Sequence, residues 1–126
     1  MENRSSVLLI FTGGTISMGE NSSNHSLAPL DTKQVLSFIP ELQMLHVNIA
    51  SVSFSPLIDS SDIQPSNWVE IAGHIQTHYD DFDGFVVLHG TDTMAYSAAA
   101  LSFMLNGLRK PVIFTGSQLP VGVLRS

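Results

Sequence analysis

The sequence has no cysteine, few charged residues and no long apolar run. Without cysteine, disulfides, thiolate catalysis and cysteine-based zinc sites are excluded. Lysine and arginine number 5 against 11 acidic residues, a formal net charge of −6, so the chain offers no basic face to nucleic acid. The first apolar run, residues 7–11, is too short for a signal peptide, and none is long enough to cross a bilayer. These absences favour a soluble cytoplasmic protein with no nucleic-acid or membrane partner.

The chain is, by contrast, rich enough in apolar residues to build a core. They make up 44% of 126 residues, and the length suits one domain spanning residues 1–126. Disorder is therefore excluded as the overall state of the chain.

Apolar runs and helical spacings alternate along the chain. The runs predict strands at residues 7–11, 46–54, 84–88 and 112–115. The spacings predict helices at residues 31–39, 65–79 and 94–105, with loops at 17–26 and 55–64. Strands that alternate with helices form a parallel sheet with right-handed crossovers. The predicted fold class is therefore α/β, a doubly wound parallel sheet of the three-layer, flavodoxin-like kind.

Small polar residues follow each predicted strand, at residues 12–15, 59–62, 89–93 and 115–118. The carboxyl ends of parallel strands meet at one edge of a sheet, which is where open α/β folds bind ligands. Hydroxyls and carboxylates with hardly any lysine or arginine favour a small polar or zwitterionic ligand over a polyanion. We expect a ligand site of that kind at this edge.

Two of these clusters carry a family signature. Thr-Gly-Gly-Thr-Ile at residues 12–16 precedes His-Gly-Thr-Asp-Thr at 89–93, with Asp-Ser-Ser-Asp at 59–62 between them. The chain from Val7 onward resembles the N-terminal part of bacterial-type L-asparaginases, most closely the cytoplasmic type I branch. The resemblance implies hydrolysis of L-asparagine to L-aspartate and ammonia, in asparagine metabolism, without a cofactor and as a homodimer or homotetramer.

The resemblance also implies the catalytic residues. Thr15 matches the family's nucleophile, and Thr91 and Asp92 match its catalytic Thr-Asp pair. A threonine hydroxyl is a weak nucleophile, so it needs a proton acceptor and donors for the developing oxyanion. Thr15 would form an acyl ester that water then cleaves, with Thr91 activating water or polarising the amide.

Substrate-binding roles follow from the same resemblance. Asp92 would bind the substrate ammonium, and the hydroxyls and backbone of Ser60 and Ser61 would bind its α-carboxylate. Asp59 belongs to the same loop. Ser117, in the loop after the last strand, would contact the leaving amide.

Two family features are not found in the sequence up to Ser126. One is a lysine downstream of the Thr-Asp pair, for which Lys110 does not substitute because it precedes the last strand, at the remote edge. The other is a smaller C-terminal α/β domain. We therefore expect residues 1–126 to be the N-terminal part of the enzyme. The family often has a lid tyrosine in the loop after the nucleophile, but no tyrosine occurs between Thr15 and Tyr79, and His25 lies near the expected place.

Other interpretations stay open at this point. A small amino-acid-binding module without turnover fits the same loops, whereas a nucleotide binder lacks the glycine-loop spacings. Within the family, preference for asparagine or glutamine is open, as is an amidotransferase subunit acting on charged tRNA. Asp62 could instead cap the following helix.

The helix predicted at residues 94–105 has more apolar surface than one sheet face needs, which predicts self-association. The residues that form this surface are Met94, Ala98, Leu101, Met104 and Leu105.

Overall fold

A computed structural model describes residues 4–13, 18–20, 27–29, 44–58 and 60–116. In chain order the elements are β1 (Ser5–Gly13), β2 (Met18–Glu20), β3 (Leu27–Pro29), β4 (Val47–Ile58), the 3-10 helix η3 (Ser60–Asp62), α2 (Pro65–Thr77), β5 (Gly84–Leu88), α3 (Met94–Met104) and β6 (Val112–Thr115). The helix predicted at residues 31–39 lies outside the described residues.

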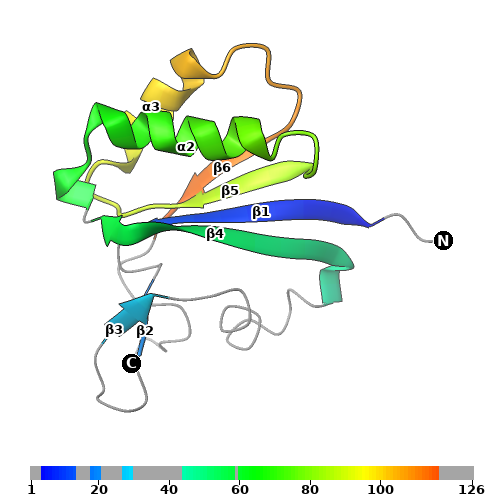
Figure 1. The fold of residues 1–126 in the computed structure, drawn as a ribbon, viewed down its shortest axis with the longest axis horizontal. Helices are drawn as coiled ribbons and strands as arrows, with labels where there is room; N and C mark the ends of the chain where they lie inside the picture. The colour runs from blue at the N-terminus through cyan, green and yellow to red at the C-terminus, as the bar shows by residue number, and fades with distance from the viewer. Residues whose placement is uncertain (1–3, 14–17, 21–26, 30–43, 59, 117–126) are drawn as a thin grey trace.

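Four strands form one sheet in the order β4-β1-β5-β6, and every pair in it is parallel. β1 pairs with β4 on one side and with β5 on the other, and β6 follows on the far side of β5 (Figure 1). The predicted parallel α/β sheet is confirmed. The strand order is that of a flavodoxin-like sheet, in which the chain first winds one way from β1 and later the other way from β5.

A separate two-stranded hairpin was not predicted. β2 and β3 pair antiparallel, with Met18 opposite Pro29 and Glu20 opposite Leu27. Both strands fall in or beside the segment expected to be a loop. Each has three residues, which is too short for an alternating pattern to be visible in the sequence.

β4 differs from its prediction at both ends. It begins at Val47 rather than at residue 46 because His46 has a φ of 53°, in the left-handed region that a strand residue does not adopt. It also continues to Ile58, four residues past the predicted end, through Pro56. Proline is tolerated there because β4 is an edge strand of the described sheet.

α2 begins at Pro65, as predicted, but its N-cap is Gln64 and not Asp62. The backbone N–H of Gln64 donates to Asn67 Oδ1 at 2.7 Å, and the Asn67 N–H donates to the Gln64 carbonyl at 2.8 Å. Asp62 belongs to η3, which rules out the interpretation that its side chain caps this helix.

The core lies between the sheet and the two helices, α2 and α3, which both lie on the same side of it (Figure 1). Residues of β1, β4 and β5 meet residues of both helices there: Leu8, Ile10, Phe54, Ile71, Ala72, Ile75, Phe85, Val87, Leu101 and Leu105. Phe11 points to the other side of β1 and is 1% exposed, so this central strand is covered on both faces. The apolar face predicted for α2 is confirmed.

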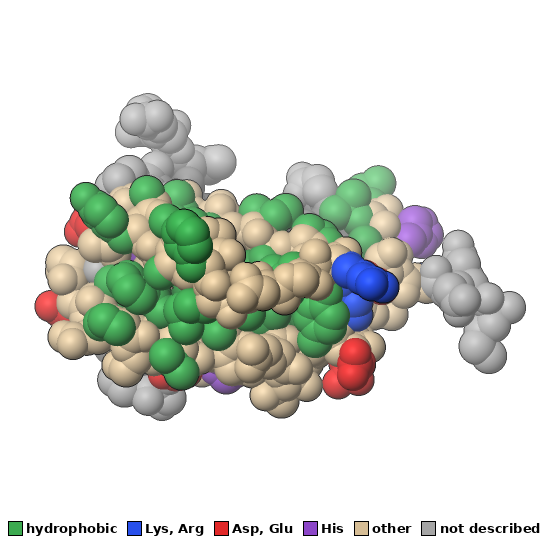
Figure 2. Space-filling model, turned by 90° about the horizontal axis from the view of Figure 1, so that it is seen from above, with side chains coloured by type: hydrophobic (Ala, Val, Ile, Leu, Met, Phe, Trp, Pro, Cys, Tyr) green, Lys and Arg blue, Asp and Glu red, His purple; other side chains and the backbone are tan. Residues whose placement is uncertain are grey.

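Trp68 and Ser97 join the two helices where they pack together. The Trp68 indole Nε1–H donates to Ser97 Oγ at 2.8 Å, and Ser97 is fully buried. The outer surface of α3 is apolar as well: Tyr96 is 71% and Phe103 82% exposed. Figure 2, a view onto the helix-covered side, shows apolar side chains standing on that surface.

Candidate active site

All four strands of the sheet end at the same edge, because all of them are parallel. The winding direction changes between β1 and β5, which are neighbours in the sheet. In open α/β sheets, ligands bind outside the carboxyl ends of the strands at such a switch point. The loops that follow β1 and β5 are those that carry the two signatures.

Gly13 brings the end of β1 into contact with the end of β4. A Cβ at Gly13 would lie 1.7 Å from the carbonyl oxygen of Ile58, a distance that no side chain can occupy. The pairing shifts register between Phe11 and Gly13, so that Gly13 lies opposite Ile58. Only glycine allows this approach. The backbone at the start of the first signature loop therefore lies directly against Ile58, at the start of the loop that contains residues 59–62.

Thr12 ties the end of β1 to the end of β5 on the other side. Its hydroxyl donates to the carbonyl oxygen of Leu88 at 2.9 Å, and the residue is 1% exposed. A buried hydroxyl needs a hydrogen-bond partner within the protein, and here that partner is the end of the neighbouring strand β5. The two signature loops therefore leave from strand ends that are held together.

β5 and β6 meet in the same way. The N–H of His89 donates to the Thr115 carbonyl at 2.9 Å, which extends the ladder one residue beyond β5. A Cβ at Gly116 would lie 2.5 Å from the His89 carbonyl oxygen and 3.2 Å from Thr91 Cγ2. The loop that carries Thr91 therefore packs directly on the end of β6.

The structure describes some of the predicted site residues and not others. Thr91 and Asp92 are exposed in the turn between β5 and α3. Ser61 is exposed in η3, directly after β4, and Ser60 belongs to the same 3-10 turn. The remaining predicted residues lie outside the described residues: Thr15, Asp59 and Ser117. Every predicted site residue thus follows, in the sequence, the end of one of the strands that meet at this edge.

Sequence reasoning assigned no role to Thr12 and Gly116, which hold this edge together. The signal for Thr12 was present, because a threonine directly after an apolar run is placed to be buried at a strand end. Gly116 gave no such signal, because its close neighbours come from the loop after another strand. His89, the first residue of the second signature, is also fully buried at this edge.

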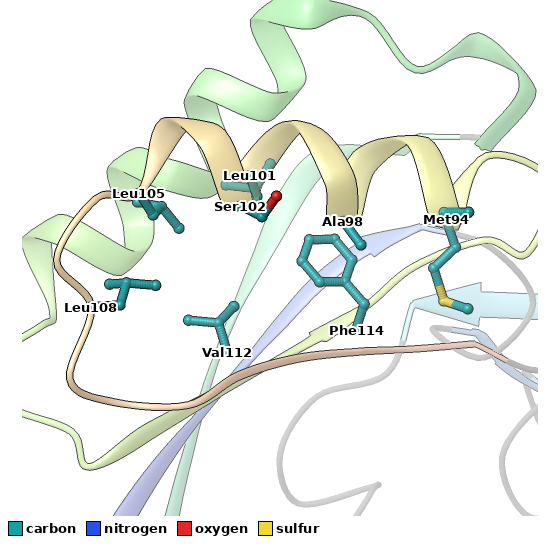
Figure 3. A pocket seen from close by; sticks show the side chains of 9 residues that line it. Met94, Ala98, Leu101, Ser102, Leu105, Leu108, Val112 and Phe114 are labelled. Atoms are coloured by element: carbon teal, nitrogen blue, oxygen red, sulfur yellow. The ribbon is translucent and has the colours of Figure 1, made fainter.

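The described residues also include a groove whose lining runs from Met94, beside Gly116 at this edge, to Leu108. It lies between α3 and β6, has a volume of about 440 Å³ and is mostly apolar, with Ala98 and Leu101 facing Val112 and Phe114 across it (Figure 3). An apolar groove of this kind does not suit a zwitterionic amino acid. The candidate active site is therefore the polar strand edge, not this hollow.

The described residues contain neither a cluster of metal ligands nor a membrane-spanning helix. Within them, no three His, Cys, Asp or Glu side chains come together in a way that could hold a metal ion. None of the helices in this part of the chain is long and apolar enough to cross a membrane. His74 lies on α2 with its Nε2 3.9 Å from Glu70 Oε2, and His78, one turn further on, is the C-cap of that helix.

The fold defines a parallel α/β protein with polar loops at the carboxyl edge of its sheet, and comparison with known proteins gives its family. Residues 6–126 match the model described as asparaginase, N-terminal. The chain belongs to the asparaginase family and corresponds to its N-terminal region.

Three relatives illustrate the similarity. L-asparaginase 1 of Escherichia coli K12 is 47% identical over 124 residues, which are 98% of this chain and 37% of that protein. The crystal structure of L-asparaginase I from Vibrio cholerae is 44% identical with a TM-score of 0.84, over 98% of this chain and 37% of that one. The structure of a probable cytoplasmic L-asparaginase from Campylobacter jejuni is 28% identical with a TM-score of 0.77, over 96% and 37%. The chain thus spans little more than a third of the length of these relatives.

Proposed function

We propose that this chain forms part of an L-asparaginase site that hydrolyses L-asparagine to L-aspartate and ammonia. The observation that carries the proposal is the meeting of four strand ends at one edge. Gly13 packs on Ile58, and Gly116 packs on His89 and Thr91. These contacts support a shared site for loops that lie far apart in the sequence. The similarity to proteins named L-asparaginase supports the choice of substrate.

In the proposed reaction, the Thr15 hydroxyl attacks the side-chain amide carbon of asparagine. The C–N bond breaks, the hydroxyl proton ends on the leaving nitrogen, and ammonia departs from an acyl ester on Thr15. Water then cleaves that ester, releasing aspartate and restoring the hydroxyl. Thr91 assists as a polar group beside the reacting carbonyl or water.

Substrate binding is proposed for the other polar residues of the edge. The exposed Asp92 carboxylate pairs with the substrate ammonium through the attraction of opposite charges. Ser60 and Ser61, with Asp59 beside them, supply hydroxyl and backbone donors for the α-carboxylate. Ser117 contacts the leaving amide. We also propose that residues 1–126 act as the N-terminal domain of the enzyme, beside a smaller C-terminal domain and a downstream lysine.

The first test is ammonia release from L-asparagine by the purified chain and by Thr15→Ala, with circular dichroism of both. Loss of the nucleophile is expected to lower any release by about 10³-fold or more. Titration calorimetry with L-asparagine on the wild-type chain and Asp92→Asn covers a chain that binds without turnover, and Asp80→Asn, at an exposed turn of the opposite edge, is the control.

Three outcomes separate the possibilities. Release that depends on Thr15 supports the enzyme. Binding that depends on Asp92 without ammonia supports an amino-acid-binding module instead. A folded chain that neither binds nor hydrolyses asparagine contradicts the proposal for these residues.

Cytoplasmic location and self-association are further parts of the proposal. The description of the Campylobacter jejuni relative as probably cytoplasmic supports the former. Of the residues from which self-association was predicted, Leu101 and Leu105 are buried in the core and cannot form such a surface. Self-association is supported instead by exposed apolar side chains on α3 and β6, including Phe103 (82% exposed) and Ile113 (56% exposed), which a second copy of the chain would cover. A strict monomer in sedimentation equilibrium would contradict self-association.

A further inference from the structure

His89 is a fully buried histidine directly after β5 and two residues before Thr91. Its ring lies against Phe114 of β6, with 6.0 Å between the ring centres. Its backbone N–H is already used in the bond to Thr115. Both backbone and ring are therefore held between β5 and β6, beneath the turn that leads to α3.

The two ring nitrogens of His89 are in different situations. Nδ1 lies 2.7 Å from the carbonyl oxygen of Gly90, and because a carbonyl only accepts, Nδ1 carries the proton. Nε2 is buried and has no hydrogen-bond partner among the described residues. A buried acceptor without a partner is unfavourable, whereas an apolar side chain would fill the same volume without that cost. The Nδ1–H bond to the Gly90 carbonyl is thus the one polar contact that the described structure gives the imidazole ring.

That contact acts on the turn that carries the candidate catalytic pair. Gly90 directly precedes Thr91 and Asp92, and its carbonyl oxygen is held by the ring. On the other side, Gly116 packs against the His89 carbonyl and the Thr91 methyl group. The turn is therefore fixed at Gly90 by the imidazole and at Thr91 by the end of β6.

We propose that His89 is a positioning residue, which sets the geometry of the Thr91–Asp92 turn through its Nδ1–H bond to the Gly90 carbonyl. It touches neither substrate nor reacting atoms. Its importance for asparagine binding rests on the proposed function, but its effect on the turn does not. His89 supports the turn in a single tautomer, with the proton on Nδ1.

The test compares His89→Leu with His89→Asn. Leucine fills similar volume and removes both the donor and the unpartnered acceptor, so the domain should fold with nearly unchanged circular dichroism. Asparagine keeps a short N–H donor near the position of Nδ1. His78→Asn, at the end of α2, is the control for replacing a histidine away from the turn.

Three measurements report on the turn. In the wild-type chain, long-range ¹H–¹⁵N spectra should show the His89 proton on Nδ1. Backbone ¹⁵N order parameters at Gly90–Asp92 should be near ~0.85 in the wild-type chain, fall below about 0.6 in His89→Leu, and recover in His89→Asn. Binding of L-asparagine should weaken about fivefold in His89→Leu, equivalent to ~1 kcal/mol for one lost hydrogen bond, and recover in His89→Asn.

The outcomes separate this inference from the proposed function. A proton on Nε2 would overturn it, as would order parameters in folded His89→Leu that equal those of the wild-type chain. A folded His89→Asn variant whose order parameters at Gly90–Asp92 do not recover would overturn it too. If the wild-type chain does not bind asparagine, the proposed function fails, while the tautomer and the order parameters still decide the role of His89.

Discussion

The amino and carboxyl edges of the sheet use polar residues differently. At the amino edge, where the strands begin, polar side chains bind the backbone. Asp83 accepts from the Ser6 N–H at 2.8 Å, and the Asp83 N–H donates to the Ser6 carbonyl at 2.7 Å. The Lys110 ammonium donates to the Tyr79 carbonyl and lies 4.7 Å from the centre of its ring. The Tyr79 hydroxyl accepts from the Arg109 N–H at 2.8 Å.

At the carboxyl edge, buried residues provide the structural contacts instead. The Thr12 hydroxyl and the backbone N–H of His89 tie neighbouring strand ends, and two glycines let backbones approach closely. The side chain of Asp92 is exposed to solvent there. A carboxylate that the protein's own backbone had neutralised would be less able to bind an ammonium group. The contrast is the one expected if the carboxyl edge binds the ligand, as proposed, while the amino edge holds the fold.

The largest effect on folding is expected from Gly13→Ala. The new methyl group would lie 1.7 Å from the Ile58 carbonyl oxygen, so the two strand ends must separate. We expect a loss of about 3 kcal/mol or more in the free energy of unfolding. Urea unfolding followed by the fluorescence of Trp68, the sole tryptophan of the sequence, measures it.

Gly73→Ala is the matched control, because no described residue outside the helix backbone around Gly73 lies within 4 Å of the added methyl group. Gly73 is inside α2, where alanine favours the helix by about 1 kcal/mol, so this variant should be more stable than the wild-type chain. A loss below about 1 kcal/mol for Gly13→Ala would show that β1 and β4 do not meet as described.

A smaller effect is expected from Thr12→Val, which keeps the shape of the side chain and removes its hydroxyl. The buried Leu88 carbonyl loses one hydrogen bond, and we expect a loss of about 1–2 kcal/mol in the free energy of unfolding. Thr77→Val, at the exposed end of α2, should change it by less than about 0.5 kcal/mol. Equal effects of the two changes would contradict a tie between β1 and β5.

Strand and helix ends were predictable from the sequence where the signal is local, and not where it depends on the rest of the fold. β5 and β6 have the predicted ends, and α2 starts at the predicted proline, because apolar runs and helix-start residues are local signals. The extension of β4 through Pro56 was not predictable, because tolerance of proline depends on the strand lying at an edge. The left-handed conformation of His46 has no local signal either.

The site shows the same limit. The meeting of the strand ends was predictable from the parallel sheet alone. The contacts that fix them were not, because the Gly13–Ile58 and Gly116–Thr91 approaches depend on how distant segments pack. The bond between the exposed Asp83 and the first strand was not predictable either, because its partner Ser6 lies 77 positions away in the sequence.

The smallest effect is expected from Asp83→Asn at the amino edge. The amide keeps an acceptor for the Ser6 N–H but removes the charge that strengthens this bond. Because the bond is exposed, water and salt screen that charge, and the loss should stay near ~0.5 kcal/mol and shrink in high salt. Asp80→Asn, in the same turn, should change the free energy of unfolding less. Neither change should alter the affinity for asparagine. If Asp83→Asn changed that affinity without a loss of stability, the amino edge would also shape the ligand site. The contrast between the two edges would then fail.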